Sequence, residues 1–288
     1  MFLIFDTETT GLPLNWNAPL TDNNNWPRCI QIAWQLHDKD GSCISHEDYL
    51  VIPDGFTVPY DAEIIHGIST ALANKEGLPL EEVLEKFQDA LKQCEFVGGH
   101  NVKFDLNIMG AEFFRINGEN PLESLLIIDT CNEETANFCK LPGGRRGKFK
   151  LPSLMELHAC LFETQFEEVH NATADVEATT RCLFELFRQG RLKPEVLKNR
   201  VEVINHLKEV LKGPVQGIGL KHENLKAASI RLVGLANSKE EPSKVLSYAE
   251  EELLQKVPFV HLHTHSQYSV LQSTSRIHDL IKIAADDQ

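Results

Sequence analysis

The sequence predicts an α/β protein whose mixed sheet begins with three antiparallel strands and continues with parallel ones. The chain opens on an apolar run rich in strand-forming residues, Phe2–Phe5, which is typical of a buried strand. Two further strand patterns follow, joined by the Asp-Gly turn signal at Asp40–Gly41. Amphipathic helices then alternate with short apolar strands as far as about residue 190, the pattern of a mixed sheet flanked by helices.

The first half of the predicted domain holds the antiparallel strands and two helices. Cys29–His37 alternates as a second strand, and the third strand is expected to extend through Ile52. Asp61–His66 predicts a short helix that ends at Gly67. The apolar residues of Leu80–Cys94 recur at helical spacing, which predicts a longer helix.

The second half alternates strands and helices. In chain order we expect a strand at Phe96–Asn101, a helix at Lys103–Ile116, a strand at Leu125–Asp129, a helix at Cys131–Lys140, a flexible basic loop at Leu141–Lys150, a helix from Pro152 to Phe162 and a helix at Ala172–Gln189. The helix that ends at Phe162 is predicted to begin at Pro152 because proline is favoured in the first turn of a helix.

Three regions are therefore expected. Residues 1–190 form the compact domain, and residues 191–257 a helical and linker region. Within the second region, Pro194–Leu211 predicts one amphipathic helix, while residues 213–257 are polar and loosely patterned. Residues 258–288 change character and are treated separately below.

The composition excludes several classes of protein. No run of about 18 or more apolar residues occurs, so no membrane-spanning helix is expected. The chain starts directly with a strand pattern rather than a secretory signal, and its seven cysteines lack Cys-x-x-Cys spacing, which fits a cytoplasmic protein. The net charge of −14 argues against tight autonomous binding of nucleic acid, although bound metal or a partner can supply positive charge.

Two acids, Asp6 and Glu8, end the first strand two residues apart. Because side chains alternate along a strand, both carboxylates emerge on the same side. Their mutual repulsion and lost hydration favour a neutralising cation, and oxygen ligands suit Mg²⁺ or Mn²⁺. An Asp-x-Glu at a strand end also occurs without any metal.

Two further stretches carry acids or a histidine. Asp105 lies just inside a predicted helix, in GHNVKFD, and Asp175 lies in the first turn of another, in HNATAD. The helix dipole alone favours acids at such places, and His170 alone is typical of a loop histidine. The order and spacing of the three stretches in an α/β pattern instead favour one shared site.

With these motifs the chain resembles the DEDD family of 3′–5′ exonucleases, histidine variant, the group containing the proofreading epsilon subunit of bacterial DNA polymerase III. The matching stretches are FDTETTG at Phe5–Gly11, GHNVKFD at Gly99–Asp105 and HNATAD at His170–Asp175. The resemblance covers roughly residues 1–190 and implies a ribonuclease H-like fold and a DNA 3′ end as substrate.

The resemblance implies that Asp6, Glu8, Asp105 and Asp175 hold two Mg²⁺ or Mn²⁺ ions and that His170 is the general base. Two ions about 4 Å apart can clamp the attacking and leaving oxygens of an in-line displacement at phosphorus. Histidine, with an ordinary pKa of about 6.5, can accept a proton from water near neutral pH.

The resemblance also implies contacts with substrate. Thr9 and Leu12 fall where relatives hold the terminal nucleotide, His66 falls in a substrate-side segment, and Asn101 lies beside the metal ligands. Purely structural roles remain open for all four residues.

A polar insertion, Asn15–Pro27, separates the first two strands and carries Trp16 and Trp26. We favour a solvated loop with the tryptophans packed beneath it. The other interpretation is that an aromatic side chain near the metal site stacks on a substrate base.

Near the C-terminal end, His261, His263 and His265 alternate and so share one face of a strand-like run, as metal-binding imidazoles can. This run resembles the first motif of the PHP (polymerase and histidinol phosphatase) domain that opens the catalytic alpha subunit of DNA polymerase III, with His263 and His265 matching its His-x-His. The resemblance implies that residues 258–288 are the truncated start of such a domain. A surface strand that carries histidines is the other interpretation.

We therefore expect a metal-dependent 3′–5′ exonuclease that removes nucleoside monophosphates from single-stranded or frayed DNA 3′ ends. It would proofread within a DNA polymerase III alpha-type polypeptide, beside the replicative polymerase regions of the longer chain. An exoribonuclease and a non-catalytic polymerase assembly module remain open, while the truncation disfavours a PHP-type phosphoesterase.

Overall fold

The computed structural model describes residues 1–164, 171–219 and 224–239. A first compact unit comprises Met1–Asn237, and its described part contains a mixed sheet with the strand order β3-β2-β1-β4-β5. The strands are β1 (Phe2–Thr9), β2 (Cys29–His37), β3 (Cys43–Leu50), β4 (Phe96–Gly99) and β5 (Leu126–Asp129). The first three are antiparallel, and β4 and β5 continue the sheet in parallel, which confirms the predicted fold class.

The central strand β1 contributes to a hydrophobic core on each face of the sheet. Leu3 and Phe5 belong to one buried cluster, and Phe2 and Ile4 belong to another. This alternation follows from the two-residue period of a strand. All four side chains are at most 2% exposed, so neither face of β1 can shift by one residue without burying the wrong set.

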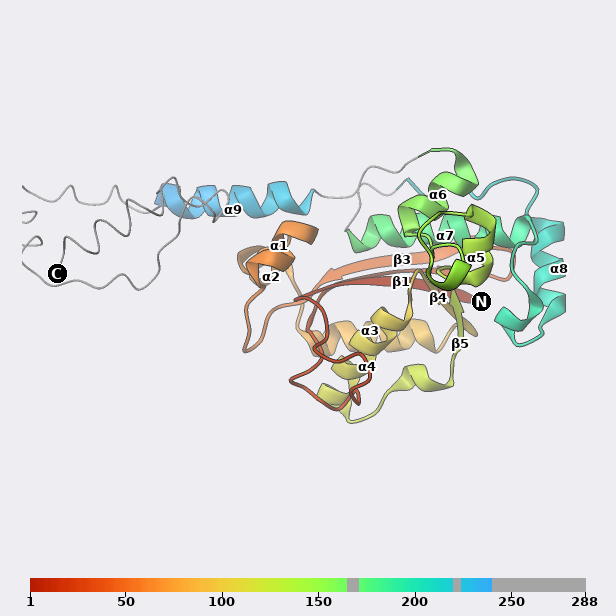
Figure 1. Cartoon of the computed structure of the whole chain (residues 1–288). Coiled ribbons are helices and arrows are strands. Elements are labelled where there is room, and N and C mark those ends of the chain that lie inside the picture. Colours follow the sequence, from red (N-terminus) through yellow and green to blue (C-terminus); the bar gives the residue numbers. More distant parts are fainter. Residues whose placement is uncertain (165–170, 220–223, 240–288) are drawn as a thin grey trace, which may run out of the picture. The chain divides into compact units, whose positions relative to one another are not determined.

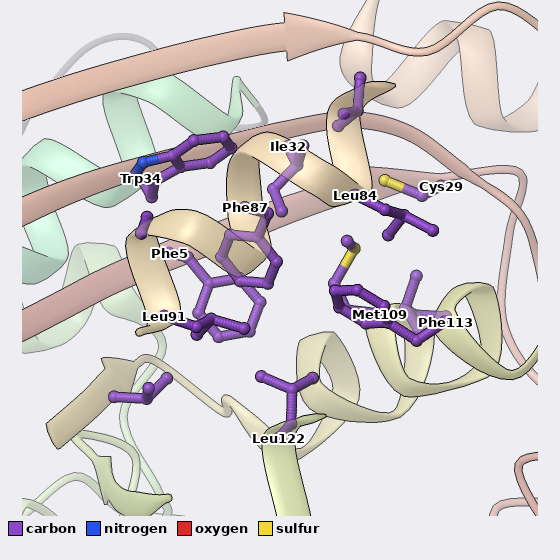
Figure 2. Packing of buried hydrophobic residues seen from close by; sticks show 14 of the residues in the cluster. Phe5, Cys29, Ile32, Trp34, Leu84, Phe87, Leu91, Met109, Phe113 and Leu122 are labelled. Carbon is purple, nitrogen blue, oxygen red and sulfur yellow. The ribbon is translucent and has the colours of Figure 1, made fainter. Parts of the chain in front are cut away.

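Helices α3 (Leu80–Leu91) and α4 (Lys103–Asn117) cover the first face of the sheet. Both lie below the strands in Figure 1. Phe87 of α3 sits between two aromatic rings of the sheet, with its centroid 5.2 Å from that of Phe5 and 5.3 Å from that of Trp34. Figure 2 shows this packing, which continues into Met109 and Phe113 of α4.

Helices α6 (Leu154–Phe162), α7 (Ala172–Arg188) and α8 (Val201–Val210) contribute to the core on the second face, with α5 (Glu133–Cys139) beside α6. The ring of Phe2 is stacked on that of Phe96 with centroids 5.1 Å apart. The ring of Phe184 of α7 packs edge-on against Phe2, with centroids 5.6 Å apart. This aromatic contact fixes α7 against the centre of the sheet.

Two helix predictions need correction. The single helix expected at Pro194–Leu211 is a 3-10 helix, η3 (Pro194–Leu197), followed by α8. Lys198 and Asn199 separate them in left-handed conformations with φ of 48° and 64°, which end an α-helix. The helix expected to begin at Pro152 begins at Leu154. Its N-cap is Ser153, whose side chain forms a capping box with that of Glu156.

Three helices contribute to a further buried cluster: α1 (Tyr60–His66), α2 (Thr70–Glu76) and α9 (Leu225–Lys239). The sequence predicts α1 but neither α2 nor α9. Ser229 ties α9 to the turn between α1 and α2, since its Oγ accepts from Ser69 N at 3.0 Å and donates to Gly67 O at 2.7 Å. Part of the expected linker is therefore folded, while the boundary near residue 190 stays a prediction.

No helix in the described part of the chain combines the length and the apolar character needed to cross a membrane.

A buried carboxylate joins α4 to the start of β2. Glu112 is fully buried and accepts hydrogen bonds from Arg28 Nε at 3.0 Å and from the Cys29 backbone at 2.8 Å. Arg115 Nη1 lies 3.0 Å from the same carboxylate, and its Nη2 donates to Trp26 O at 2.6 Å. These contacts attach the end of the Asn15–Pro27 insertion to α4.

We expect Glu112→Ala to lower the free energy of unfolding by about 3 kcal/mol, because it leaves Arg115 buried without its partner. Urea unfolding at neutral pH measures this loss. Glu119→Ala, an exposed change just beyond α4, is the matched control and should stay within about 0.5 kcal/mol of wild type. A loss in the Glu112 variant no larger than that of the control would show that this network does not stabilise the fold.

Candidate active site

Three carboxylates meet beside the central strand. Asp6 and Glu8 follow the alternation of Phe2 and Ile4, so they face the side of the sheet on which α7 packs. Asp175 lies in the first turn of α7. Carboxylate oxygens of the three residues lie within 4.8 Å of one another, so the structure brings together residues that the sequence separates by 169 positions.

The fourth predicted acid, Asp105, lies on α4. It is held by Thr7, the residue between Asp6 and Glu8. Thr7 points to the face opposite Asp6 and Glu8, where its Oγ1 donates to Asp105 Oδ1 at 2.7 Å and its backbone N–H donates to the same oxygen at 3.0 Å. Asp105 is 4% exposed. Its charge raises the pKa of Asp6 and of Glu8, so it acts on the same site although it stands outside the 4.8 Å cluster.

Residues of β2 and β3 position the start of α7. Gln31 lies opposite Glu8 in the sheet, and its side-chain oxygen accepts from Ala172 N at 3.3 Å, while its amide donates to Asp48 at 2.9 Å. The other oxygen of Asp48 accepts from Thr173 Oγ1 at 2.5 Å. These polar contacts hold the helix turn that carries Asp175 against the strand that carries Glu8. The motifs predicted none of them.

The turn before α4 is fixed by Asp129 at the end of β5. Its Oδ1 accepts from the backbone N–H of Asn101 and from that of Cys131, both at 2.8 Å. Asn101 has a φ of 58°, a left-handed conformation that asparagine tolerates better than most residues. Asp129 thereby stabilises the turn that leads into the helix carrying Asp105.

Asp6, Glu8 and Asp105 have raised pKa values. Burial raises the pKa of Asp6 well above its ordinary value, and the charges of Asp105, Asp175 and Glu8 raise it further. Burial followed by the charges of Asp175 and Asp105 raises the pKa of Glu8 to about 8. Burial also raises the pKa of Asp105 to about 7, although the Thr7 hydrogen bonds oppose that shift.

This donor set fits divalent cations. It consists of carboxylate oxygens, which suit Mg²⁺ and Mn²⁺, and its spacing brings several oxygens to one place. The charges that shift Asp6 and Glu8 all come from other carboxylates. Repulsion of this kind is relieved when a bound cation is shared among the acids.

The other predicted site residues lie in varied settings. Thr9 is buried and its Oγ1 donates to Gly11 O at 2.8 Å, whereas Leu12 is 73% exposed. His66 is buried at the end of α1, where Nδ1 accepts from Ile68 N at 3.1 Å. Asn101 is exposed. Contacts of these four with substrate stay predictions.

Three predicted histidines, His170, His263 and His265, fall outside the described residues. Their roles as general base and as PHP-type metal ligands therefore stay predictions.

The two tryptophans of the insertion differ. Trp26 is 3% exposed and belongs to the first core cluster, as the packed interpretation predicts. Trp16 remains 48% exposed, and its ring lies 5.8 Å from that of Phe104, the neighbour of Asp105 in the chain. A base-stacking role remains open for Trp16.

The mixed sheet, with acids gathered at its central strand, matches a ribonuclease H-like fold found among exonucleases. The family model described as Exonuclease (RNase_T) matches residues 3–183. The chain therefore belongs to the exonuclease family, whose members hydrolyse nucleic acids.

Solved structures of exonuclease I share this fold. E. coli exonuclease I in complex with a dT13 oligonucleotide is 20% identical with a TM-score of 0.53, covering 68% of this chain and 42% of that chain. The zinc-bound E. coli exonuclease I–ssDNA complex is 22% identical with a TM-score of 0.51 and the same coverage. A product-bound exonuclease I is 18% identical with a TM-score of 0.51, covering 72% and 46%. The similarity thus concerns the fold, and the matched region is less than half of exonuclease I. No curated protein sequence matches the chain.

We expect Thr7→Val to weaken Mn²⁺ binding about tenfold, because Asp105 loses the hydroxyl that orients it. Thr7→Ser keeps the hydroxyl and should bind Mn²⁺ like wild type. Calorimetric titration of the protein without substrate measures both affinities. Equal Mn²⁺ affinity in the valine and serine variants would contradict a positioning role for Thr7.

The raised pKa values predict how the stability of the metal-free protein depends on pH. Glu8 and Asp105, with pKa values of about 8 and 7, hold protons in the folded state at pH values where the unfolded chain has lost them. Their stabilising effect is fully present below the unfolded-state values of about 4 and is lost as pH rises from there to these folded-state values, so stability should fall between about pH 4 and 8.

Melting temperatures measured in chelator across this range test the expectation. Asp6→Asn removes one of the repelling charges, so its melting temperature should rise relative to wild type as the pH increases. Buried histidines such as His100, whose pKa burial lowers to about 4, contribute equally to both proteins. A constant difference between the two across the range would refute this account.

Proposed function

We propose that the chain is a metal-dependent 3′–5′ exonuclease that shortens DNA from its 3′ end. The observation that supports this most directly is the convergence of Asp6, Glu8 and Asp175 beside the buried Asp105, in a chain of the exonuclease family. In this proposal the four carboxylates hold two divalent ions, Mg²⁺ or Mn²⁺. When bound, such ions stabilise the charge that develops on the scissile phosphate and make a bound water more acidic.

The protein's own groups then have distinct tasks. Asp6, Glu8 and Asp175 bind from the α7 side, and Asp105 is oriented from the α4 side by Thr7. His170 accepts the proton of the attacking water at a ring nitrogen, since an imidazole is the side chain with a suitable ordinary pKa. Thr9 and Leu12 hold the terminal nucleotide, His66 belongs to a segment on the substrate side, and Asn101 supports the metal ligands.

DNA is the substrate that we propose over RNA. The exonuclease I structures with the same fold contain single-stranded DNA. The C-terminal run with His263 and His265 resembles the first motif of the PHP domain that opens the alpha subunit of DNA polymerase III. We propose that the chain proofreads as part of a DNA polymerase III alpha-type polypeptide, with the polymerase regions as its partner.

Product analysis with matched 5′-labelled single strands of DNA and RNA tests the activity. The expected result is a ladder that shortens from the 3′ end, requires Mg²⁺ or Mn²⁺, disappears in chelator and is stronger with DNA. Preferential cleavage of RNA would reassign the chain as an exoribonuclease, and cleavage that survives chelation would exclude the metal site.

We expect Asp6→Asn, Asp175→Asn and His170→Ala each to lower kcat by about 10²–10³-fold, the typical effect of removing one group that stabilises a transition state. Glu119→Gln, an exposed change away from the site, is the control. The folded fraction of every variant is checked by its circular dichroism. Undiminished cleavage in the aspartate variants would reject this assignment.

A further inference from the structure

The chain concentrates positive charge in one short segment. Residues 140–151, here termed the basic loop, contain five cations and no acid, whereas the whole chain has 28 Lys and Arg against 42 Asp and Glu. The five cations are Lys140, Arg145, Arg146, Lys148 and Lys150. A polyanion approaching this acidic protein therefore meets a favourable local charge here.

The basic loop, which includes the flexible segment predicted at Leu141–Lys150, is folded back on itself. Lys150 N donates to Leu141 O at 3.0 Å and closes its base, and Lys148 N donates to Arg145 O at 3.2 Å. A Cβ added to Gly144 would lie 2.2 Å from Lys148 O, so only glycine permits this close crossing of the two arms. The loop thus presents its cations from a defined backbone.

Hydrogen bonds join the end of the basic loop to the edge of the sheet where the acids lie. Pro152 O, just after the loop, accepts from His100 Nε2 at 3.0 Å and from Cys131 Sγ at 3.6 Å. His100 follows β4, whose Gly98 pairs with Ile4, two residues before Asp6. The carboxyl ends of parallel strands are where α/β proteins bind their ligands, and Pro152, the residue after the basic loop, contacts the end of β4 there.

Both arginines of the basic loop are available for an external partner. Lys148 pairs with Glu133, and Lys150 lies 2.7 Å from Glu156. In the described part of the chain, neither Arg145 nor Arg146 has a carboxylate within 4.0 Å, and both are exposed. Guanidinium groups match phosphate oxygens in a bidentate geometry.

An aromatic side chain and a hollow accompany the two arginines. Phe149 is 41% exposed, and it lines a cavity of about 390 Å³ together with Gly144, Arg145 and Lys148 of the loop and Asn137 of α5. Cavities of this size accept small ligands. Cations interleaved with an exposed aromatic ring form the combination that binds single strands by phosphate pairing and base stacking.

We propose that the basic loop binds the substrate strand upstream of the scissile phosphate, with Arg145 and Arg146 on its phosphodiesters and Phe149 against one of its bases. This inference rests on the proposed nuclease function, because the acid cluster defines where the 3′ end lies. An acidic protein is a second candidate for a basic patch, and the cavity beside Phe149 favours a strand that carries bases.

The test compares two substrates of the full chain. One is a single-stranded 12-mer, and the other is the 4-nitrophenyl ester of thymidine 5′-monophosphate, which has no upstream phosphodiester. We expect the double variant Arg145→Gln/Arg146→Gln to raise KM for the 12-mer about tenfold, with kcat and ester hydrolysis unchanged. The slope of log(kcat/KM) against log salt should decrease in magnitude by about 1.4, or about 0.7 for each phosphate that the variant no longer neutralises.

Two comparisons complete the design. Lys75→Gln/Lys92→Gln removes two charges from side chains that are more than half exposed on α2 and after α3, and it should leave KM for the 12-mer close to wild type. Phe149→Ala should raise that KM, whereas Phe149→Tyr should preserve it, since both rings can stack on a base.

The outcomes separate the two proposals. A wild-type protein that hydrolyses neither substrate overturns the nuclease function. A wild type that hydrolyses both, with an arginine double variant whose KM and salt slope equal those of the lysine control, overturns the role of the basic loop and leaves the nuclease intact. Equal slowing of both substrates in the arginine variant also overturns it, because the ester cannot reach upstream contacts.

Discussion

The side-chain alternation of β1 is the constraint on which both the fold and the site depend. Phe2 and Ile4 commit one face of the strand to the α7 side, and Leu3 and Phe5 commit the other to α3 and α4. The same alternation continues through the three residues that follow. Asp6 and Glu8 must then face α7 and Asp175, while Thr7 must face α4 and Asp105. The hydrophobic core thus fixes the register that assembles the acids, since a slip of one residue would exchange the two faces.

This arrangement sets function against stability. Burying acids beside one another raises the pKa of Asp6, Glu8 and Asp105, which means that their ionised forms destabilise the metal-free fold. The surrounding structure offsets this cost with aromatic packing on both faces of β1 and with donors aimed at individual acids. A well-packed scaffold that tolerates such repulsion at a site of chemistry is what a cation-binding cluster requires.

The sequence predicts those features that repeat along the chain and misses those that join distant residues. Periodicity predicts β1 and the amphipathic α3, and the two-residue spacing of Asp6 and Glu8 places them on one side. The hydrogen bonds of Thr7 with Asp105 and of Gln31 with Ala172 span 98 and 141 residues, so no local pattern indicates them. Asp105 and Asp175 are predicted as site residues only from the family motifs. Their positions alone do not indicate a site, because an acid near a helix N-terminus is common in any protein. The sequence does not indicate the break before α8, because Lys198 and Asn199 adopt left-handed conformations that usually require glycine.

The distribution of charge explains how so acidic a chain can be suited to a polyanionic substrate. Cations placed against Asp6 or Glu8 would pair with them and compete with divalent ions for the same oxygens. The charges that shift these two acids are all carboxylates, so the basic loop leaves them unneutralised, although Pro152, the residue after it, contacts the end of β4. In the proposed function, metal therefore attracts the phosphate that is cleaved, and arginine attracts the phosphates that are not. In this proposal, the arginines of the basic loop stay apart from the metal ions. The acid cluster then stays selective for divalent ions while the arginines hold the substrate strand.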